Sequence, residues 1–365
     1  MKNTFGNALT ITLFGESHGD AIGAVLDGLS PGIKIDTALM NKRLSQRKPK
    51  KGTGTARREG DAFMILSGAQ NGYTTGTPLC IVIYNENQHS SDYSSLVNTP
   101  RPGHADYAAE QKYHGFQDVR GGGHFSGRLT APIVAAGALL EGALLAQGIQ
   151  IYTHIKSMGN ILDDALNDDN VARLDGAEFP TLSEDAAKKM TEYILKAAEN
   201  GDSVGGILES EIRGLPAGLG EPWFDSVEGL LSHALFSIGG IKGVAFGAGF
   251  DFATMHGSEA NDPFAYENGR VITTTNNNGG INGGITNGMP VRFSCAVKPT
   301  PSIYKEQKTV DLSTKENAEI AIQGRHDPAI IQRAAPVVSA ISALVIADLL
   351  TVRFGSDALT NGLRK

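Results

Sequence analysis

Cysteine is scarce in this sequence, and its two cysteines are not spaced for pairing. Cys80 and Cys295 lie in alternating apolar stretches, and no C-x-x-C motif occurs among the 365 residues. This usage is typical of buried free thiols in a reducing compartment and argues against a disulfide-built secreted fold. The first 19 residues also lack the charged start and apolar run of a secretion signal. We therefore expect a cytoplasmic protein.

The chain also lacks excess positive charge and a clean membrane-spanning run. Its 32 Lys and Arg face 39 Asp and Glu, and the net charge of -7 argues against a general nucleic-acid or anionic-membrane binder. The most apolar segment, residues 334–352, contains two serines and Asp348 and is followed by Arg353. That pattern favours a buried helix over a membrane span.

Several familiar site motifs are absent. The sequence has no G-x-x-x-x-G-K-[ST] loop, no G-x-G-x-x-G after a strand, and no H-E-x-x-H or H-x-x-x-H pair among its nine histidines. The first two absences exclude the common phosphate loop and the dinucleotide fingerprint. The absence of such histidine pairs argues against a metallohydrolase, and we expect no metal site.

Glycine is abundant, and one segment concentrates positive charge. The 45 glycines make up about 12% of the chain against ~7% in an average protein. Residues 42–58 hold eight cationic side chains and no acidic one. Such a segment can draw in a small, highly charged anion. A solvated surface loop is an equally good interpretation from composition alone.

Periodicity predicts strands and helices in both halves of the chain. Alternation favours strands over residues 8–14, 21–27, 63–68, 79–85, 206–213 and 290–298. Helical spacing favours residues 104–114, 131–147, 184–200 and 336–352, the third starting with a Thr181–Glu184 capping box. Residues 131–147 and 336–352 are apolar nearly all round, so sheets must cover them. We predict an α+β layered sandwich with buried helices between antiparallel β-sheets, as a single domain over residues 1–365.

Three polar clusters carry residues suited to chemistry. GESHG at residues 15–19 places Ser17 and His18 at a strand end, where a histidine can act as a general acid. RPGHAD at residues 101–106 combines an anion-binding arginine with a histidine at a helix start. RGGGHFSGRLT at residues 120–130 allows close backbone approach to a flat or phosphorylated ligand. Each cluster taken alone could be an ordinary structural loop, such as a helix cap at Asp106.

These clusters and three further motifs resemble the chorismate synthase family along nearly the whole chain. Besides the three above, they are EQKY at residues 110–113, PAGLGEP at 216–222 and GRHDP at 324–328, all in family order. The resemblance implies a lyase that converts 5-enolpyruvylshikimate 3-phosphate to chorismate and phosphate. It also implies a requirement for reduced FMN without net redox change, NADPH as a possible indirect reductant, the sandwich fold, and a homotetramer.

The resemblance assigns roles to individual residues. His18 resembles the acid that protonates the departing phosphate, and His104 resembles the residue that manages charge at the reduced flavin. Asp327 resembles the carboxylate near the proton that is lost, with Ser17 and Ser126 as orienting hydroxyls. The arginines that match substrate-binding positions are Arg47, Arg101 and Arg128. A guanidinium suits phosphate and carboxylate groups because it can bind them through two hydrogen bonds.

The implied FMN contacts are spread over five segments. They are His124, Phe125, Ser126, Gly239, Gly240, Gly283, Lys298, Pro299, Thr300, Pro301, Ser302 and Arg325. Two pairs depart from the common family pattern: His124-Phe125 stands where many relatives have a basic residue and serine, and Gly239-Gly240 replaces an Asn-Ala type of pair. The same glycine-rich turns are also compatible with a second function, that of a flavin reductase or carrier. The absence of a dinucleotide-binding fingerprint argues against this alternative.

Overall fold

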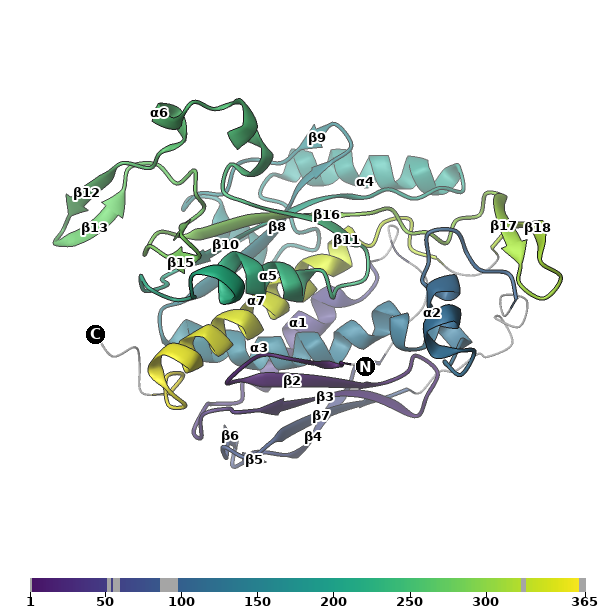
Figure 1. Cartoon of the computed structure of the whole chain (residues 1–365), viewed down its shortest axis with the longest axis horizontal. Helices are drawn as coiled ribbons and strands as arrows, with labels where there is room; N and C mark the ends of the chain where they lie inside the picture. Colours follow the sequence, from purple (N-terminus) through teal and green to yellow (C-terminus); the bar gives the residue numbers. More distant parts are fainter. Residues whose placement is uncertain (1, 51–53, 55–59, 86–97, 323–325, 361–365) are drawn as a thin grey trace.

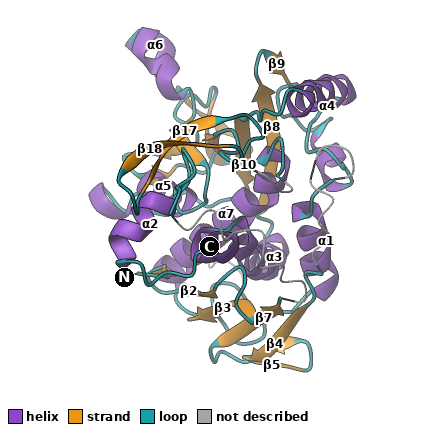
Figure 2. Ribbon diagram, turned by 90° about the vertical axis from the view of Figure 1, so that its right-hand side faces the viewer, coloured by secondary structure: helices purple, strands orange, loops and turns teal. Residues whose placement is uncertain are grey.

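Two antiparallel sheets enclose a layer of helices (Figure 1). The computed structural model describes residues 2–50, 54, 60–85, 98–322 and 326–360. The side view in Figure 2 shows the same order of layers, with α3 and α7 lying between the sheets. The predicted α+β sandwich with buried helices is therefore confirmed.

The first sheet is built from the N-terminal part of the chain. Its strands, in spatial order, are β1 (Thr4–Phe5), β2 (Thr10–Gly15), β3 (Ala21–Asp27), β7 (Leu79–Tyr84) and β4 (Phe63–Ser67). Every neighbouring pair is antiparallel. In β3 the alternate residues Ile22, Ala24 and Leu26 are fully buried, as expected for one face packed on a core. The β2–β3 turn and the C-terminal end of β7 lie at the same end of the strands in this sheet.

The second sheet comes from the C-terminal half. Its order is β11 (Ile241–Phe246), β16 (Val291–Val297), β10 (Gly206–Arg213), β8 (Gln150–Met158) and β9 (Ile161–Leu162). All four pairings are antiparallel. The odd-numbered residues of β16, from Val291 to Val297, are buried, which confirms the face expected from the sequence. Cys295 lies on that face, whereas Cys80 is only half-buried, so its predicted full burial is wrong.

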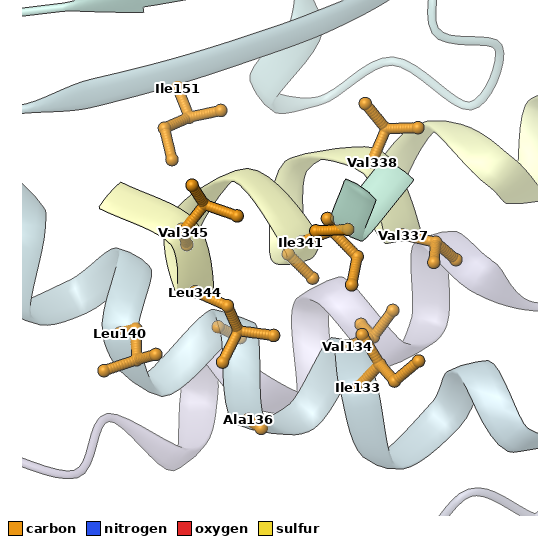
Figure 3. Close-up of a cluster of buried hydrophobic side chains, with 14 of the residues drawn as sticks. Ile133, Val134, Ala136, Leu140, Ile151, Val337, Val338, Ile341, Leu344 and Val345 are labelled. Carbon is orange, nitrogen blue, oxygen red and sulfur yellow. The ribbon is translucent and has the colours of Figure 1, made fainter. Parts of the chain in front are cut away.

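Four helices fill the space between the sheets. They are α1 (Thr37–Arg47), α3 (Thr130–Ala146), α5 (Val227–Leu235) and α7 (Ile331–Phe354). Figure 3 shows α3 and α7 packing through Ile133, Val134 and Leu140 against Ile341 and Leu344. Their backbones approach closely at Gly137, where a Cβ would lie 2.4 Å from Cβ of Ala340. Small residues at the crossing thus set the distance between the two helices.

The remaining elements lie around this sandwich. Three are helices: α2 (Asp106–Tyr113), α4 (Glu184–Glu199) and α6 (Gly257–Ala260). Four are hairpins: β5–β6 (Ala69–Gln70, Tyr73–Thr74), β12–β13 (Phe264–Glu267, Arg270–Thr273), β14–β15 (Ile281–Asn282, Ile285–Thr286) and β17–β18 (Gln307–Asp311, Glu316–Ile320). The described residues also form the 3-10 turns η2 (Arg120–Phe125), η3 (Gly127–Leu129), η4 (Val171–Asp175), η5 (Trp223–Asp225) and η6 (Gly249–Thr254). In Figure 1, α2 and β17–β18 lie at one end of the molecule, and β12–β13 projects from the other.

Several details of the helices differ from the prediction. The α7 helix begins at Ile331, five residues before the predicted start, and it contains Pro336. The cap of α4 is Ser183, whose hydroxyl accepts from the backbone N–H of Ala186, so the proposed Thr181 cap is wrong. Two helical stretches, Gly127–Ala146 and Ile331–Phe354, are long and apolar enough to cross a membrane by composition. Their most apolar windows are 78% and 89% buried inside the protein, as expected for core helices.

Candidate active site

The turn between β2 and β3 presents Ser17 and His18 beneath a glycine-rich loop. Both residues are only 3% exposed. The backbone N–H of Ser17 donates to the carbonyl of Gly123 at 3.1 Å, and that of Gly19 donates to the carbonyl of Glu16 at 3.1 Å. The Ser17 hydroxyl is buried and has no hydrogen-bond partner among the described residues. Because most buried hydroxyls have partners, this atom marks a place for a ligand.

The triple glycine brings two histidines to one loop. Gly121, Gly122 and Gly123 all have positive φ, a conformation that side chains disfavour. A Cβ on Gly121 would lie 2.1 Å from Cε1 of His18, and one on Gly122 would lie 3.6 Å from Cε1 of His104. Glycine is thus required at residue 121 by both backbone conformation and space, and the loop passes beside both imidazole rings.

Arg101, His104 and Asp106 form an ion-pair network at the start of α2. The Asp106 carboxylate accepts from Nε and Nη2 of Arg101, both at 2.7 Å, and from Nδ1 of His104 at 2.5 Å. Burial by itself raises the pKa of this carboxyl, but the donors from Arg101 and His104 hold the pKa well below its usual range. Nδ1 of His104 also lies 3.0 Å from Nη2 of Arg101, and its shorter contact with Asp106 favours a proton on Nδ1.

A second network joins two of the predicted substrate-binding arginines through one buried carboxylate. Nη2 of Arg47 donates to Asp61 at 3.0 Å, and Nη1 of Arg128 contacts the other oxygen of Asp61. The side chains of Arg47, Asp61 and Arg128 are 1%, 1% and 6% exposed. Ser126 supports this arrangement, because its hydroxyl accepts from the backbone N–H of Arg128 at 3.3 Å. Two guanidinium groups thus share one buried carboxylate.

Asp327 is held by Arg333, in the first turn of α7. Nη1 of Arg333 contacts the Asp327 carboxylate, while its Nε donates to the backbone carbonyl of Arg47 at 2.9 Å. The neighbouring His326 has a lowered pKa, first because it is buried and then because the Arg101 charge opposes protonation. Its Nε2 is buried without a hydrogen-bond partner among the described residues. Both effects favour the neutral form of the His326 imidazole.

The turn after β16 closes the site from the second sheet. The Lys298 backbone N–H donates to the carbonyl of Gly240 at 2.9 Å, and its ammonium contacts the carbonyl of Gly103. Burial and the charge of Lys242 lower the pKa of Lys298. Thr300 adds a buried hydroxyl that has no partner in the described parts of the chain. Ser302 accepts weakly from Nη1 of Arg101, at 3.5 Å.

These contacts, together with the electrostatic influence of Arg101 on His326, arrange the site residues in a ring. In spatial order the ring consists of His18, Gly121, Gly122, His104, Asp106, Arg101, His326, Asp327, Arg333, Arg47, Asp61, Arg128 and Asn85, which returns to the His18 loop. The ring contains four Arg and three Asp residues, and Lys298 in the turn beside it adds a fifth cation. A site with excess positive charge on a protein of net charge -7 favours a small anion.

Not every predicted site residue joins this ring. The His124 ring binds the carbonyl of Gly15 through Nδ1 at 2.9 Å, and Phe125 packs edge-on against Tyr113 and is 42% exposed. Both side chains therefore already make structural contacts. Gly283 lies in the β14–β15 hairpin, which precedes the start of β16, whereas Lys298 follows the end of β16. A strand of this length spans roughly 20 Å, so the two residues lie at opposite ends of it. Arg325 lies outside the described residues.

The cationic segment at residues 42–58 is partly explained by ion pairs. Arg43 binds Glu141, and Lys42 binds Asp175 at 2.5 Å. A cavity of about 410 Å³ adjoins these pairs between α1, α3, α7 and β8, and none of the predicted site residues lines it. The loop interpretation is wrong for its first six residues, which belong to α1. Lys51, Arg57 and Arg58 lie outside the described residues.

Sequence reasoning missed four residues of the ring. They are Asp61, Asn85, His326 and Arg333. Asp61 follows the cationic segment closely, and His326 precedes Asp327 directly, so position in the sequence could have drawn attention to both. Asn85 gave no such signal, because Arg128 lies 43 residues away, and the contact of Arg333 with Arg47 spans 286 residues. Only the contact of Arg333 with Asp327 is local, six residues apart.

Comparison with known proteins gives one consistent result. The sequence model of the family described as chorismate synthase matches residues 9–351. Chorismate synthase of Thermococcus gammatolerans is 47% identical over 348 residues, covering 95% of this chain and 97% of that protein. The Methanosarcina mazei enzyme is also 47% identical, covering 95% of each chain. A crystal structure of chorismate synthase superimposes with a TM-score of 0.75 at 28% identity, over 96% of this chain and 94% of that one.

Proposed function

Because this chain belongs to the chorismate synthase family, we propose that the ring site binds the substrate and the reduced flavin of that family's reaction. The protein is a carbon–oxygen lyase of aromatic amino acid biosynthesis that acts on a phosphate-bearing small molecule. It converts 5-enolpyruvylshikimate 3-phosphate to chorismate and inorganic phosphate. A C–O bond and a ring C–H bond are broken, and the family requires reduced flavin although no net oxidation occurs.

Three buried polar atoms without a hydrogen-bond partner carry this proposal. They are Ser17 Oγ and His326 Nε2, in the segments that build the ring, and Thr300 Oγ1, in the turn that closes it; all three lack a partner among the described residues. A buried hydroxyl or ring nitrogen without a hydrogen-bond partner costs about 1–3 kcal/mol, so such a group usually forms a hydrogen bond with a ligand or with water. Their clustering beside arginines and histidines supports a binding site for a polar, anionic ligand.

We assign the substrate to the first-sheet side of the ring. Its phosphate and two carboxylates need several guanidinium groups, and Arg47, Arg101 and Arg128 supply them. His18 is adjacent to this group and donates the proton that the departing phosphate takes up. Ser17 orients the same groups through its unpartnered hydroxyl.

We assign FMN to the side formed by the second sheet. The residues fit a phosphate-bearing flavin, because Lys298 and Lys242 bring two cations together and Gly239 leaves open space where a Cβ would be. Thr300 and His326 offer one hydroxyl and one neutral ring nitrogen to its polar edge. When bound, reduced FMN supplies the electron density that allows C–O cleavage without net redox change. The remaining predicted contacts, including Gly240, Gly283 and residues 299, 301 and 302, stay proposals.

Two further residues act at the boundary between substrate and flavin. His104 keeps its Nδ1 proton on Asp106 and turns Nε2 to the loop of Gly122, where it manages charge at the reduced flavin. Asp327 is fixed by Arg333 and accepts the ring proton. Both roles require a fixed side chain, which the ion pairs provide.

Four statements about the whole protein also belong to the proposal. We propose that residues 1–365 form one domain, which the single main apolar cluster spanning both sheets and the central helices supports. We further propose a cytoplasmic homotetramer, to which the exposed aromatic hairpin β12–β13 could contribute an interface, with Phe264 and Tyr266 69% and 83% exposed. NADPH as an indirect source of reduced FMN rests on the family resemblance.

Two variants test the proposed site. His18→Ala should lower turnover roughly 10²-fold, the usual scale for a general acid, while FMN titration remains unchanged. Thr300→Val should weaken FMN binding several-fold without lowering the melting temperature, because it removes a hydroxyl that has no protein partner. Thr191→Val on α4 is the matched control, since its hydroxyl bonds only to Ala187 within the same helix. Wild-type turnover in His18→Ala would remove this residue from the mechanism.

A further inference from the structure

The loop that carries His18 is held by one asparagine from a neighbouring strand. Asn85 directly follows β7, the antiparallel partner of β3. Its backbone N–H donates to the carbonyl of Asp20 at 3.0 Å. Its side-chain Nδ2 donates to the carbonyls of Glu16 at 3.1 Å and Gly19 at 2.7 Å. The two side-chain bonds clamp the ends of the segment that contains Ser17 and His18.

The same amide reaches the arginine network on its other side. Oδ1 of Asn85 accepts from Nε of Arg128 at 3.2 Å. Arg128 in turn contacts Asp61, which also binds Arg47. Asn85 therefore links the histidine loop to the buried arginines through side-chain hydrogen bonds.

We propose that Asn85 is a positioning residue of the lyase, which sets the distance between His18 and Arg128. The inference rests on the proposed function, in which Arg128 binds the anionic substrate and His18 protonates the phosphate that leaves. Both must reach the same substrate at once, and a displacement of about 1 Å can cost 10²-fold in rate. One planar amide fixes both because it donates at one end and accepts at the other.

Asparagine is chemically suited to this position. A carboxylate of the same shape would accept from Arg128 but could not donate to the two loop carbonyls. It would also add a second negative charge beside the arginine, which already contacts Asp61. The neutral amide adds no charge beside Arg128.

Two single variants separate the two ends of the amide. Asn85→Ala removes all three side-chain bonds, and we expect kcat to fall about 10- to 100-fold. Asn85→Asp keeps the acceptor for Arg128 and loses both donors, so we expect a similar fall in kcat and a higher KM from the added charge. Asn170→Ala is the control, because Asn170 clamps an exposed loop through the carbonyl of Ala165, away from the ring. Wild-type kcat in folded Asn85→Asp would overturn the inference.

A double-mutant cycle with His18→Ala separates positioning from general structural damage. If Asn85 acts through His18, Asn85→Ala should lower kcat by less than twofold in the His18→Ala background. If His18→Ala is impaired and the kcat losses of the two single variants multiply in the double variant, the role of Asn85 is overturned and the proposed function stands. Unchanged turnover in His18→Ala alone would overturn both. Circular dichroism of each variant checks the fold, and Asn85→Asp, the isosteric change, replaces Asn85→Ala in the cycle if the latter unfolds.

Discussion

At the scale of single residues, buried arginines are stabilised by a shared carboxylate. Arg47 and Arg128 both depend on Asp61, and all three side chains are almost fully buried. Because both guanidinium groups contact it, this carboxylate is indispensable. Removing one partner of a buried ion pair leaves an uncompensated charge in a poorly solvated place.

Asp61→Asn should therefore destabilise the protein strongly. We expect the free energy of unfolding, measured in urea, to fall by about 3–5 kcal/mol. The control is Asp168→Asn. The Asp168 side chain is 90% exposed and pairs with Arg213. An exposed pair contributes about 0–1 kcal/mol, so this variant should stay close to wild type. Equal losses in the two variants would contradict the account of the buried network.

A second buried cluster predicts a dependence of stability on pH. Nδ1 of His154 lies 2.8 Å from Asp163, and Nε2 lies 3.4 Å from Glu209. Burial lowers the pKa of His154, but the two carboxylates outweigh it and raise the pKa above its usual 6.5. Burial likewise opposes ionisation of Glu209, yet His154 and Lys156 lower its pKa to about 2. The imidazolium stabilises the fold below pH 6.5, and the carboxylate stabilises it above pH 4.5.

The wild-type protein should accordingly lose stability when the pH rises through the folded-state pKa of His154. His154→Gln removes the group that titrates, so its unfolding free energy should fall less between about pH 5.5 and about pH 8.5. Urea unfolding of both proteins at the two pH values measures the difference. The same decrease in both would show that His154 does not titrate in this range.

At the scale of elements, the crossing of α3 and α7 sets how the two sheets approach. Gly137 faces Ala340, and any added Cβ would lie 2.5 Å from the Cα of that residue. The same two helices lead into the site, since Arg128 lies just before α3 and Arg333 in the first turn of α7. Their packing therefore fixes the spacing of the arginines.

Gly137→Ala should destabilise the protein although alanine favours helices. Overpacking costs about 1–3 kcal/mol, which outweighs the gain of up to ~1 kcal/mol in helix propensity. Gly142→Ala in the same helix is the matched control, because its Cβ would meet only Cδ2 of Leu39 at an ordinary 3.7 Å. We expect that control to be neutral or more stable in thermal unfolding. A stabilised Gly137→Ala protein would contradict the tight crossing.

At the scale of the whole molecule, periodicity predicted the layers better than the contacts between them. The apolar stretch from Ala131 and the alternation of β16 identified buried elements correctly. The α1 helix was missed because cations interrupt its apolar positions, and their partners Glu141 and Asp175 lie 98 and 133 residues further on. The roles of Asn85 and Arg333 likewise depend on distant backbone carbonyls, which no local pattern reports.

The central claim is that the ring of residues, closed by the turn after β16, forms a flavin-dependent lyase site. The most direct test is an anaerobic assay of the purified protein with 5-enolpyruvylshikimate 3-phosphate and chemically reduced FMN. Oxidised FMN and flavin-free samples are the controls, and phosphate and chorismate are measured together. We predict equimolar phosphate and chorismate only with reduced FMN. Product formation without reduced flavin, or no product from folded protein that binds FMN, would contradict the claim.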